Sequence, residues 1–206
     1  MADCCNDKLC ELEALRSRQS ATLKLVLGIN AVMFGVELTA GVLAHSVSLV
    51  ADSLDMLGDT LVYGFSLYVV TRSARLKAVS ALFKGCIMAS FGLFVLGQAF
   101  YKIMVPQLPV FEAIGGIGLL ALAANGLCLA VLWRHRSDDI NMHSVWLCSR
   151  NDIVANVAVL CAAFGVWLSD SGWPDILVGL ALALFVLRSA LLVIRSAAAE
   201  LRTGQT

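Results

Sequence analysis

Three aspartates stand in an apolar stretch, LVADSLDMLGDTLV, that covers residues 49–62. Asp52, Asp55 and Asp59 are separated by three and four residues, so they share one face of a helix with about 3.6 residues per turn. An ionised Asp near the centre of a bilayer costs about 2.5–3.5 kcal/mol even on the most lenient scale. This face therefore cannot meet lipid, and we expect it to point into a helix bundle, towards water, a cation or a basic partner.

Basic side chains inside other apolar segments offer a purely structural explanation for these acids. Lys84, Arg150 and Arg188 could pair with the aspartates and hold helices together, or could extend to the membrane surface as anchors. Arg150 and Arg188 could reach one acid but hardly neutralise all three at depth. A site for a cation remains the alternative.

A second group of candidate ligands lies in WLCSRNDIVANVAVL, where Cys148, Asp152 and Asn156 recur every four residues. Counted from opposite faces of a ~30 Å core, Asp59 and Asp152 lie about 18 and 12 Å deep, so both approach the midplane. One thiolate and three carboxylates, or a four-member subset, suit a tetrahedral divalent ion, and sulfur favours zinc and cadmium over magnesium. Cys148 taken alone could equally be an ordinary buried thiol.

The elements that must position these residues are membrane helices. Of the 206 residues, 59% are hydrophobic and only 15% are charged, and the mean hydropathy is +0.83. Because a bilayer core needs roughly 20 apolar residues per helix, we predict an all-α membrane protein of six transmembrane helices. Their expected ranges are 22–43, 47–70, 78–101, 110–133, 144–168 and 174–195. Equal numbers of basic and acidic residues, 15 of each, give no indication of nucleic-acid binding.

The distribution of Lys and Arg predicts the orientation. Basic residues gather before the first segment and after the second, fourth and sixth, whereas the opposite side has only Lys102. Cytoplasmic loops retain positive charge, so both termini are expected in the cytoplasm. We therefore predict a cytosolic tail over residues 1–20 and a transmembrane domain over residues 21–206.

The tail contains three cysteines, Cys4, Cys5 and Cys10, beside acidic residues in the stretch CCNDKLCELE. Cytosolic thiols stay reduced, so a disulfide is not expected. The three thiols could capture a soft metal, although their spacing is not that of a standard zinc motif. The alternative is a disordered tail with incidental cysteines.

Two of these motifs together resemble the cation diffusion facilitator (cation efflux) family. HSVSLVADSLDMLGD is similar to the family's second-helix signature, and CSRNDIVAN is similar to its fifth-helix signature. Carried over residue by residue, the resemblance implies a metal site of Asp55, Asp59 and Asp152. Cys148 stands where the family usually has His or Asp, which leaves the fourth ligand and the metal preference open.

The resemblance implies a divalent metal exporter rather than an enzyme. Zinc is the expected ion, with cadmium or cobalt as alternatives, and protons are the expected counter-ion in an antiport cycle; no other cofactor is expected. It also implies a homodimer, and a short form of the family without the usual C-terminal cytosolic domain. The compact chain suggests a bacterial inner membrane. The alternative function is proton-coupled export of small organic cations, which would favour more aromatic residues near the acids.

Two further acids have more than one interpretation. Asp52 could lie along the metal path, together with Asn156, could hydrogen-bond a neighbouring helix, or could substitute as a metal ligand. Glu37, in the first segment, is expected to pair with Lys84 or Arg188, and the alternative is a role in proton transfer.

Overall fold

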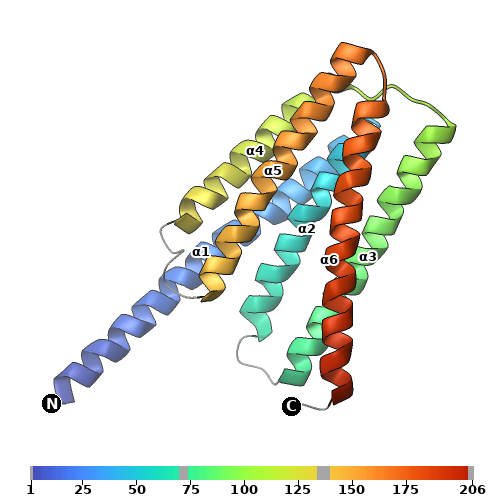
Figure 1. Ribbon diagram of the computed structural model, residues 1–206. Coiled ribbons are helices and arrows are strands. Elements are labelled where there is room, and N and C mark those ends of the chain that lie inside the picture. Colours follow the sequence, from blue (N-terminus) through green and yellow to red (C-terminus); the bar gives the residue numbers. More distant parts are fainter. Residues whose placement is uncertain (1, 70–73, 134–139, 204–206) are drawn as a thin grey trace.

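Six helices make up the chain in a computed structural model that describes residues 2–69, 74–133 and 140–203, with side chains for 21–61, 64, 76, 78–133 and 152–202 (Figure 1). The helices are α1 (Ala2–Leu43), α2 (Val47–Val69), α3 (Ala74–Met104), α4 (Phe111–Trp133), α5 (Ile140–Ser169) and α6 (Trp173–Thr203). No strand occurs in the described ranges. The predicted all-α architecture with six helices is therefore confirmed.

Within the residues whose side chains are described, five of the helices contain a stretch that is long and apolar enough to cross a membrane: α1, α3, α4, α5 and α6. The remaining helix, α2, has 23 residues but carries Asp52, Asp55 and Asp59. A charged segment of this kind is stable in a bilayer only when protein surrounds it. The packing agrees, because α2 lies against α1, α3, α5 and α6.

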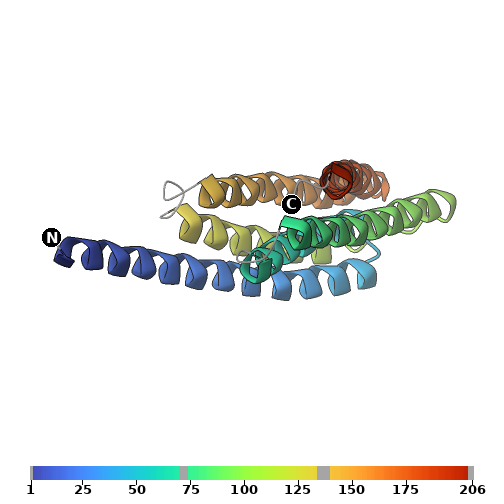
Figure 2. The same ribbon diagram turned by 90° about the horizontal axis from the view of Figure 1, so that it is seen from below.

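The N-terminal residues continue the first membrane helix. α1 begins at Ala2, and its first half extends well past the rest of the bundle (Figure 2). Residues 2–20, which we assigned to a tail, are thus helical in the structure. Both chain ends lie at the same end of the bundle, as an even number of spans requires (Figure 1). Their cytoplasmic location stays a prediction.

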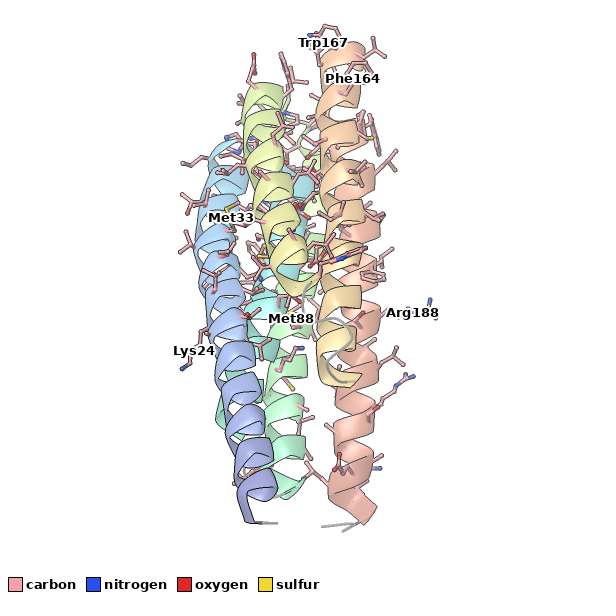
Figure 3. All side chains as sticks on the ribbon, turned by 90° about the vertical axis from the view of Figure 1, so that its left-hand side faces the viewer. Lys24, Met33, Met88, Phe164, Trp167 and Arg188 are labelled. Carbon is pink, nitrogen blue, oxygen red and sulfur yellow. The ribbon has the colours of Figure 1, made fainter. Side chains whose placement is uncertain are left out.

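The main core joins α2 to α3 and α6. Val50 and Leu54 of α2 are fully buried and pack with Val95 of α3 and Ala183 and Val186 of α6. In contrast, large apolar side chains cover the outside of the bundle, among them Phe94 of α3. Phe164 and Trp167 of α5 are two further examples (Figure 3). Inward packing around α2 with an apolar exterior is the arrangement expected of a helix bundle in lipid.

The first turn of α2 is held by an acid from α6. The Asp175 carboxylate accepts hydrogen bonds from the Ser46 and Ser48 hydroxyls, at 2.6 Å each, and from the backbone N–H groups of Val47, at 2.7 Å, and Ser48, at 3.1 Å. The Asp175 carboxylate thus accepts from backbone N–H groups that have no partner within the helix at its start. Gly179 permits the close approach, because a Cβ there would lie 2.5 Å from Val47 Cγ1. This cap was not among the features predicted from the sequence.

Candidate metal centre

Three aspartates from two helices line one cavity inside the bundle. The cavity has a volume of about 340 Å³, and its acids are Asp55 and Asp59 of α2 and Asp152 of α5. Each of these side chains is half-buried, whereas Asp52 is only 1% exposed. The three acids therefore face open space within the bundle, while the fourth acid of this region is enclosed by protein.

Helix geometry and electrostatics both indicate that these three carboxylates converge. Asp55 and Asp59 are four residues apart, so they are neighbours on one face of α2. Among the charged side chains that act on Asp152, the strongest interaction is with Asp59, followed by Asp55 and Asp52. The predicted alignment of Asp152 with the two acids of α2 is thus present in the folded chain.

The opposite wall of the cavity comes from α3 and α6. A Cβ on Gly58 would lie 3.0 Å from Met88 Cε and 3.7 Å from Met88 Sδ, so the glycine gives the thioether room beside the acids. Lys84 lines the same cavity and brings a positive charge to it. We did not predict Met88 or the α6 residues from the sequence. The further lining residues are Gly85, Phe185, Val186, Ser189, Ala190 and Val193.

The fourth predicted ligand lies outside the described side chains. The side chain of Cys148 lies outside the described residues, as do those of Cys4, Cys5 and Cys10. Among the side chains that the structure does describe, no three His, Cys, Asp or Glu residues form a group that would hold a metal ion as they stand. The metal ligand set therefore remains a prediction.

Asp52 and Asn156 belong to a chain of hydrogen bonds between helices. Asn156 Nδ2 of α5 donates to Asp52 Oδ2 of α2 at 2.8 Å, and Asn125 Nδ2 of α4 donates to Asn156 Oδ1 at 3.0 Å. All three side chains are at most 2% exposed. Asn156, which helix periodicity placed on the same stripe as Asp152, therefore hydrogen-bonds Asp52, and neither residue is among those that line the cavity.

Glu37 of α1 is enclosed, with no hydrogen-bond partner in the part of the chain that the structure describes. Its side chain is fully buried, and neither carboxylate oxygen has a hydrogen-bond partner among the described residues. Arg188 instead lies exposed and projects from the outside of the bundle (Figure 3). The predicted pairing of Glu37 with Lys84 or Arg188 is wrong, because neither Glu37 oxygen has a hydrogen-bond partner among the described side chains, which include both of these residues.

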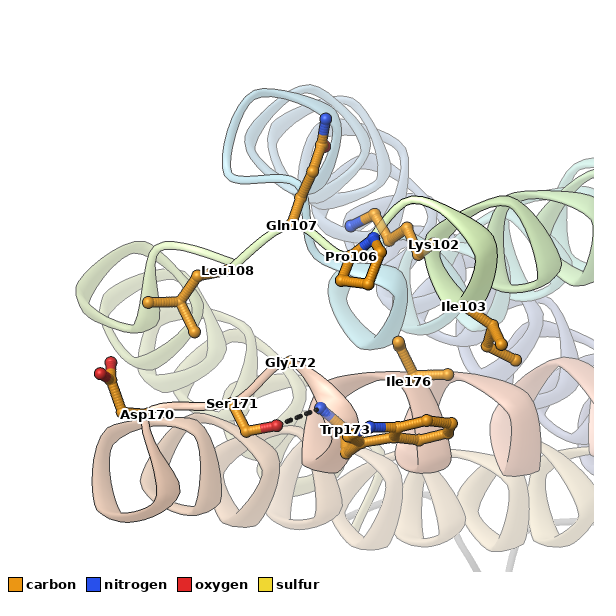
Figure 4. Close-up of a pocket in the computed structure, with 10 residues that line it drawn as sticks. All are labelled: Lys102, Ile103, Pro106, Gln107, Leu108, Asp170, Ser171, Gly172, Trp173 and Ile176. Carbon is orange, nitrogen blue, oxygen red and sulfur yellow. Dashed lines mark hydrogen bonds between the residues drawn. The ribbon is translucent and has the colours of Figure 1, made fainter.

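A second cavity, of about 250 Å³, lies at the loops that follow α3 and α5 (Figure 4). Asp170 is the acid among its lining residues, and Lys102 and Trp173 also line it. Lys102 Nζ donates to the backbone carbonyl of His45, whose own side chain is exposed. One acid beside a lysine is not a ligand set for a divalent cation, so this cavity is not a candidate metal centre.

The fold and the acid-lined cavity define a class: a helical integral membrane protein with carboxylates inside its bundle. Residues 23–202 match the cation efflux transmembrane domain. The chain belongs to this family, as the two helix motifs implied. The apolar spans and the bacterial relative both agree with the predicted location in a bacterial inner membrane.

Three relatives illustrate the range of the similarity. The zinc transporter ZitB of Escherichia coli (strain K12) is 29% identical over 196 residues, covering 86% of this chain and 61% of the relative. The vacuolar zinc transporter COT1 of Saccharomyces cerevisiae is 30% identical over 111 residues, 48% of this chain and 25% of the relative. A cadmium, cobalt and zinc/H(+)-K(+) antiporter of Bacillus subtilis is 23% identical over 171 residues, 75% of this chain and 54% of the relative. The chain thus spans about three fifths of the length of ZitB.

Proposed function

We propose that this protein exports divalent metal cations, zinc first, through the cavity between α2, α3, α5 and α6. The observation that carries the proposal is the convergence of Asp55, Asp59 and Asp152 on one cavity inside a membrane bundle. The relatives support the choice of ion, because two are named zinc transporters and the third is named for cadmium, cobalt and zinc.

The chemistry of these side chains suits exchange of metal for protons. Carboxylate oxygens bind Zn²⁺ at about 2.0–2.2 Å, and a thiolate from Cys148 would complete a tetrahedral set. Metal ligands must be deprotonated, so metal binding releases protons, and returning protons release the metal. The name of the Bacillus subtilis relative includes both H⁺ and K⁺ as exchanged ions. For this chain we propose protons as the counter-ion.

Flux measurements on purified protein in liposomes test this function directly. With a pH gradient as the driving force, we expect zinc and cadmium to accumulate against their own gradients and protons to move in the opposite direction. Dissipation of the pH gradient should stop accumulation. Accumulation of an organic cation such as tetraphenylphosphonium without any zinc flux would contradict the proposal.

Lys84 is expected to set the affinity of the site. Three carboxylates and one ammonium give the cavity a net charge of two negative units, which balances the charge of one divalent cation. Replacement of Lys84 by Met removes a positive charge from the wall of this cavity, and at an effective dielectric constant near 20 we expect zinc binding to strengthen by at least about tenfold. Calorimetric titration of the detergent-purified protein with zinc measures the change.

Lys24→Met is the matched control for Lys84→Met. Lys24 is exposed and projects from the outside of α1 (Figure 3), so its loss should leave zinc affinity unchanged. Unchanged or weaker zinc binding in Lys84→Met would show that the lysine does not compete with metal in the cavity.

A further inference from the structure

Glu37 has an environment that an ionised carboxylate does not tolerate. The side chain is 0% exposed, and both of its oxygens lack a hydrogen-bond partner among the described residues. An ionised carboxylate buried without donors is so costly that such a group normally takes up a proton or binds a cation. Glu37 therefore has to bind positive charge of some kind.

The charged side chains near Glu37 show with which part of the bundle it interacts. The charged side chains that act on it are, in order of strength, Asp52, Asp55 and Asp152, all of them acids. Asp52 is 1% exposed, and its Oδ1 also lacks a hydrogen-bond partner within the described ranges. Two buried carboxyl groups on α1 and α2 thus have unpartnered oxygens next to the acids of the cavity.

The amide chain indicates that the positive charge is a proton rather than a metal ion. Asn156 presents its N–H group to Asp52, and its oxygen is occupied by the N–H of Asn125. A bound cation beside Asp52 would need oxygen ligands, but α5 supplies a donor there. A donor stabilises Asp52 as the ionised member of the pair, which leaves the proton on Glu37.

We propose that Glu37 is a proton-carrying residue of the transport cycle, in a position separate from the metal ligands. This inference rests on the proposed function. Metal in the cavity adds two positive charges near Glu37, which compensate a carboxylate there and favour transfer of the proton from its O–H bond to solvent water. When the metal leaves, the uncompensated acids of the cavity favour rebinding of one proton at the same oxygen.

α1 offers one further polar position on the same face. Asn30 lies seven residues, or about two turns and 10 Å, before Glu37, towards the end of the bundle where both termini lie. It is 1% exposed, and its Oδ1 has no partner among the described residues, while its Nδ2 donates to the carbonyl of Val26 at 3.0 Å. This oxygen can accept a hydrogen bond from a water molecule or hydronium ion that moves a proton along α1.

Glu37→Gln tests the proposal, because it keeps the shape of the side chain and removes the proton site. Calorimetry in buffers of different ionisation enthalpy counts the protons released when zinc binds. We expect the variant to release about one proton fewer than the wild type. In liposomes, zinc uptake driven by a pH gradient should fall at least about tenfold, whereas zinc–zinc exchange, which needs no net proton movement, should continue.

Glu112→Gln and Glu37→Asp are the controls. Glu112 is exposed in the first turn of α4, so its loss should change neither the proton count nor uptake. Glu37→Asp keeps a titratable group and should recover part of the coupled uptake. Unchanged proton release in Glu37→Gln would overturn the proposal. So would an uptake defect in this variant that varies with the potassium concentration at constant pH, because Glu37 would then act on potassium and not on protons. Failure of the wild type to bind or move zinc would instead reject the proposed function.

A chemical probe tests the wild-type chain in case Glu37→Gln does not fold. Dicyclohexylcarbodiimide enters membranes and reacts with protonated carboxyl groups, whose O–H adds across one C=N bond before rearrangement to a stable N-acylurea. Mass spectrometry should find this adduct on Glu37 in zinc-free protein, and saturation with zinc should reduce it several-fold. No adduct on Glu37, or labelling that zinc does not change, would contradict the proposal.

Discussion

Asp59→Asn is expected to abolish zinc transport and to weaken zinc binding by at least about 100-fold, the upper end of the loss seen when only an outer partner of a metal ligand is removed. The asparagine keeps the size of the side chain but removes the negative charge. Asp59 is also the acid that acts most strongly on Asp152, so its replacement affects the acids of both α2 and α5. Zinc titration of purified protein and liposome flux give the two readouts.

Asp170→Asn is the matched control for this prediction. Asp170 is exposed in the turn after α5 and has a φ of 48°, a left-handed conformation that asparagine accepts. This variant should bind and transport zinc as the wild type does. Wild-type zinc affinity in Asp59→Asn, with the helical content preserved, would exclude Asp59 from the metal site.

Local periodicity was sufficient to predict the helices and the alignment of three acids. Each apolar segment is longer than the bilayer core requires, and spacings of three and four residues put Asp55 and Asp59 on one helix face. Depth along two antiparallel helices then placed Asp152 at a similar level. In the folded chain these three side chains line one cavity, and their role as ligands is what the Asp59 experiment examines.

Partners from distant parts of the chain could not be predicted in this way. Asp52 shares a helix face with Asp55 and Asp59, yet in the structure it is fixed by Asn156, 104 residues away. Nothing in the spacing of Glu37 indicates that it lacks a basic partner, because that depends on how α1 packs. Met88 likewise reaches the cavity only because Gly58 lies opposite it. Side-chain direction in a bundle follows from tertiary packing, which helix periodicity restricts but does not determine.

Asp175→Ala is expected to have the largest effect on stability. The substitution leaves the hydroxyls of Ser46 and Ser48 and two backbone N–H groups of α2 without their acceptor, although all of them are fully buried. Each buried group left unsatisfied costs about 1–3 kcal/mol. A total of only ~3 kcal/mol would lower the melting temperature by roughly 10 °C in a domain of this size. Thermal unfolding of detergent-purified protein, followed by size-exclusion chromatography, measures the shift.

The effect of Asp175 should extend from stability to function. Its carboxylate lies in the first turn of α6 and at the start of α2, where both helix dipoles favour a negative charge. Asp175→Asn keeps one acceptor oxygen but turns an N–H₂ group towards N–H donors, so we expect an intermediate melting temperature. Asp170→Asn, five residues earlier and exposed, should melt as the wild type does. If Asp175→Ala also melted within about 2 °C of the wild type, the buried donors would have another acceptor. If zinc affinity falls together with the melting temperature across the Asp175 variants, the contact with α6 holds α2 in the position where Asp55 and Asp59 line the cavity with Asp152.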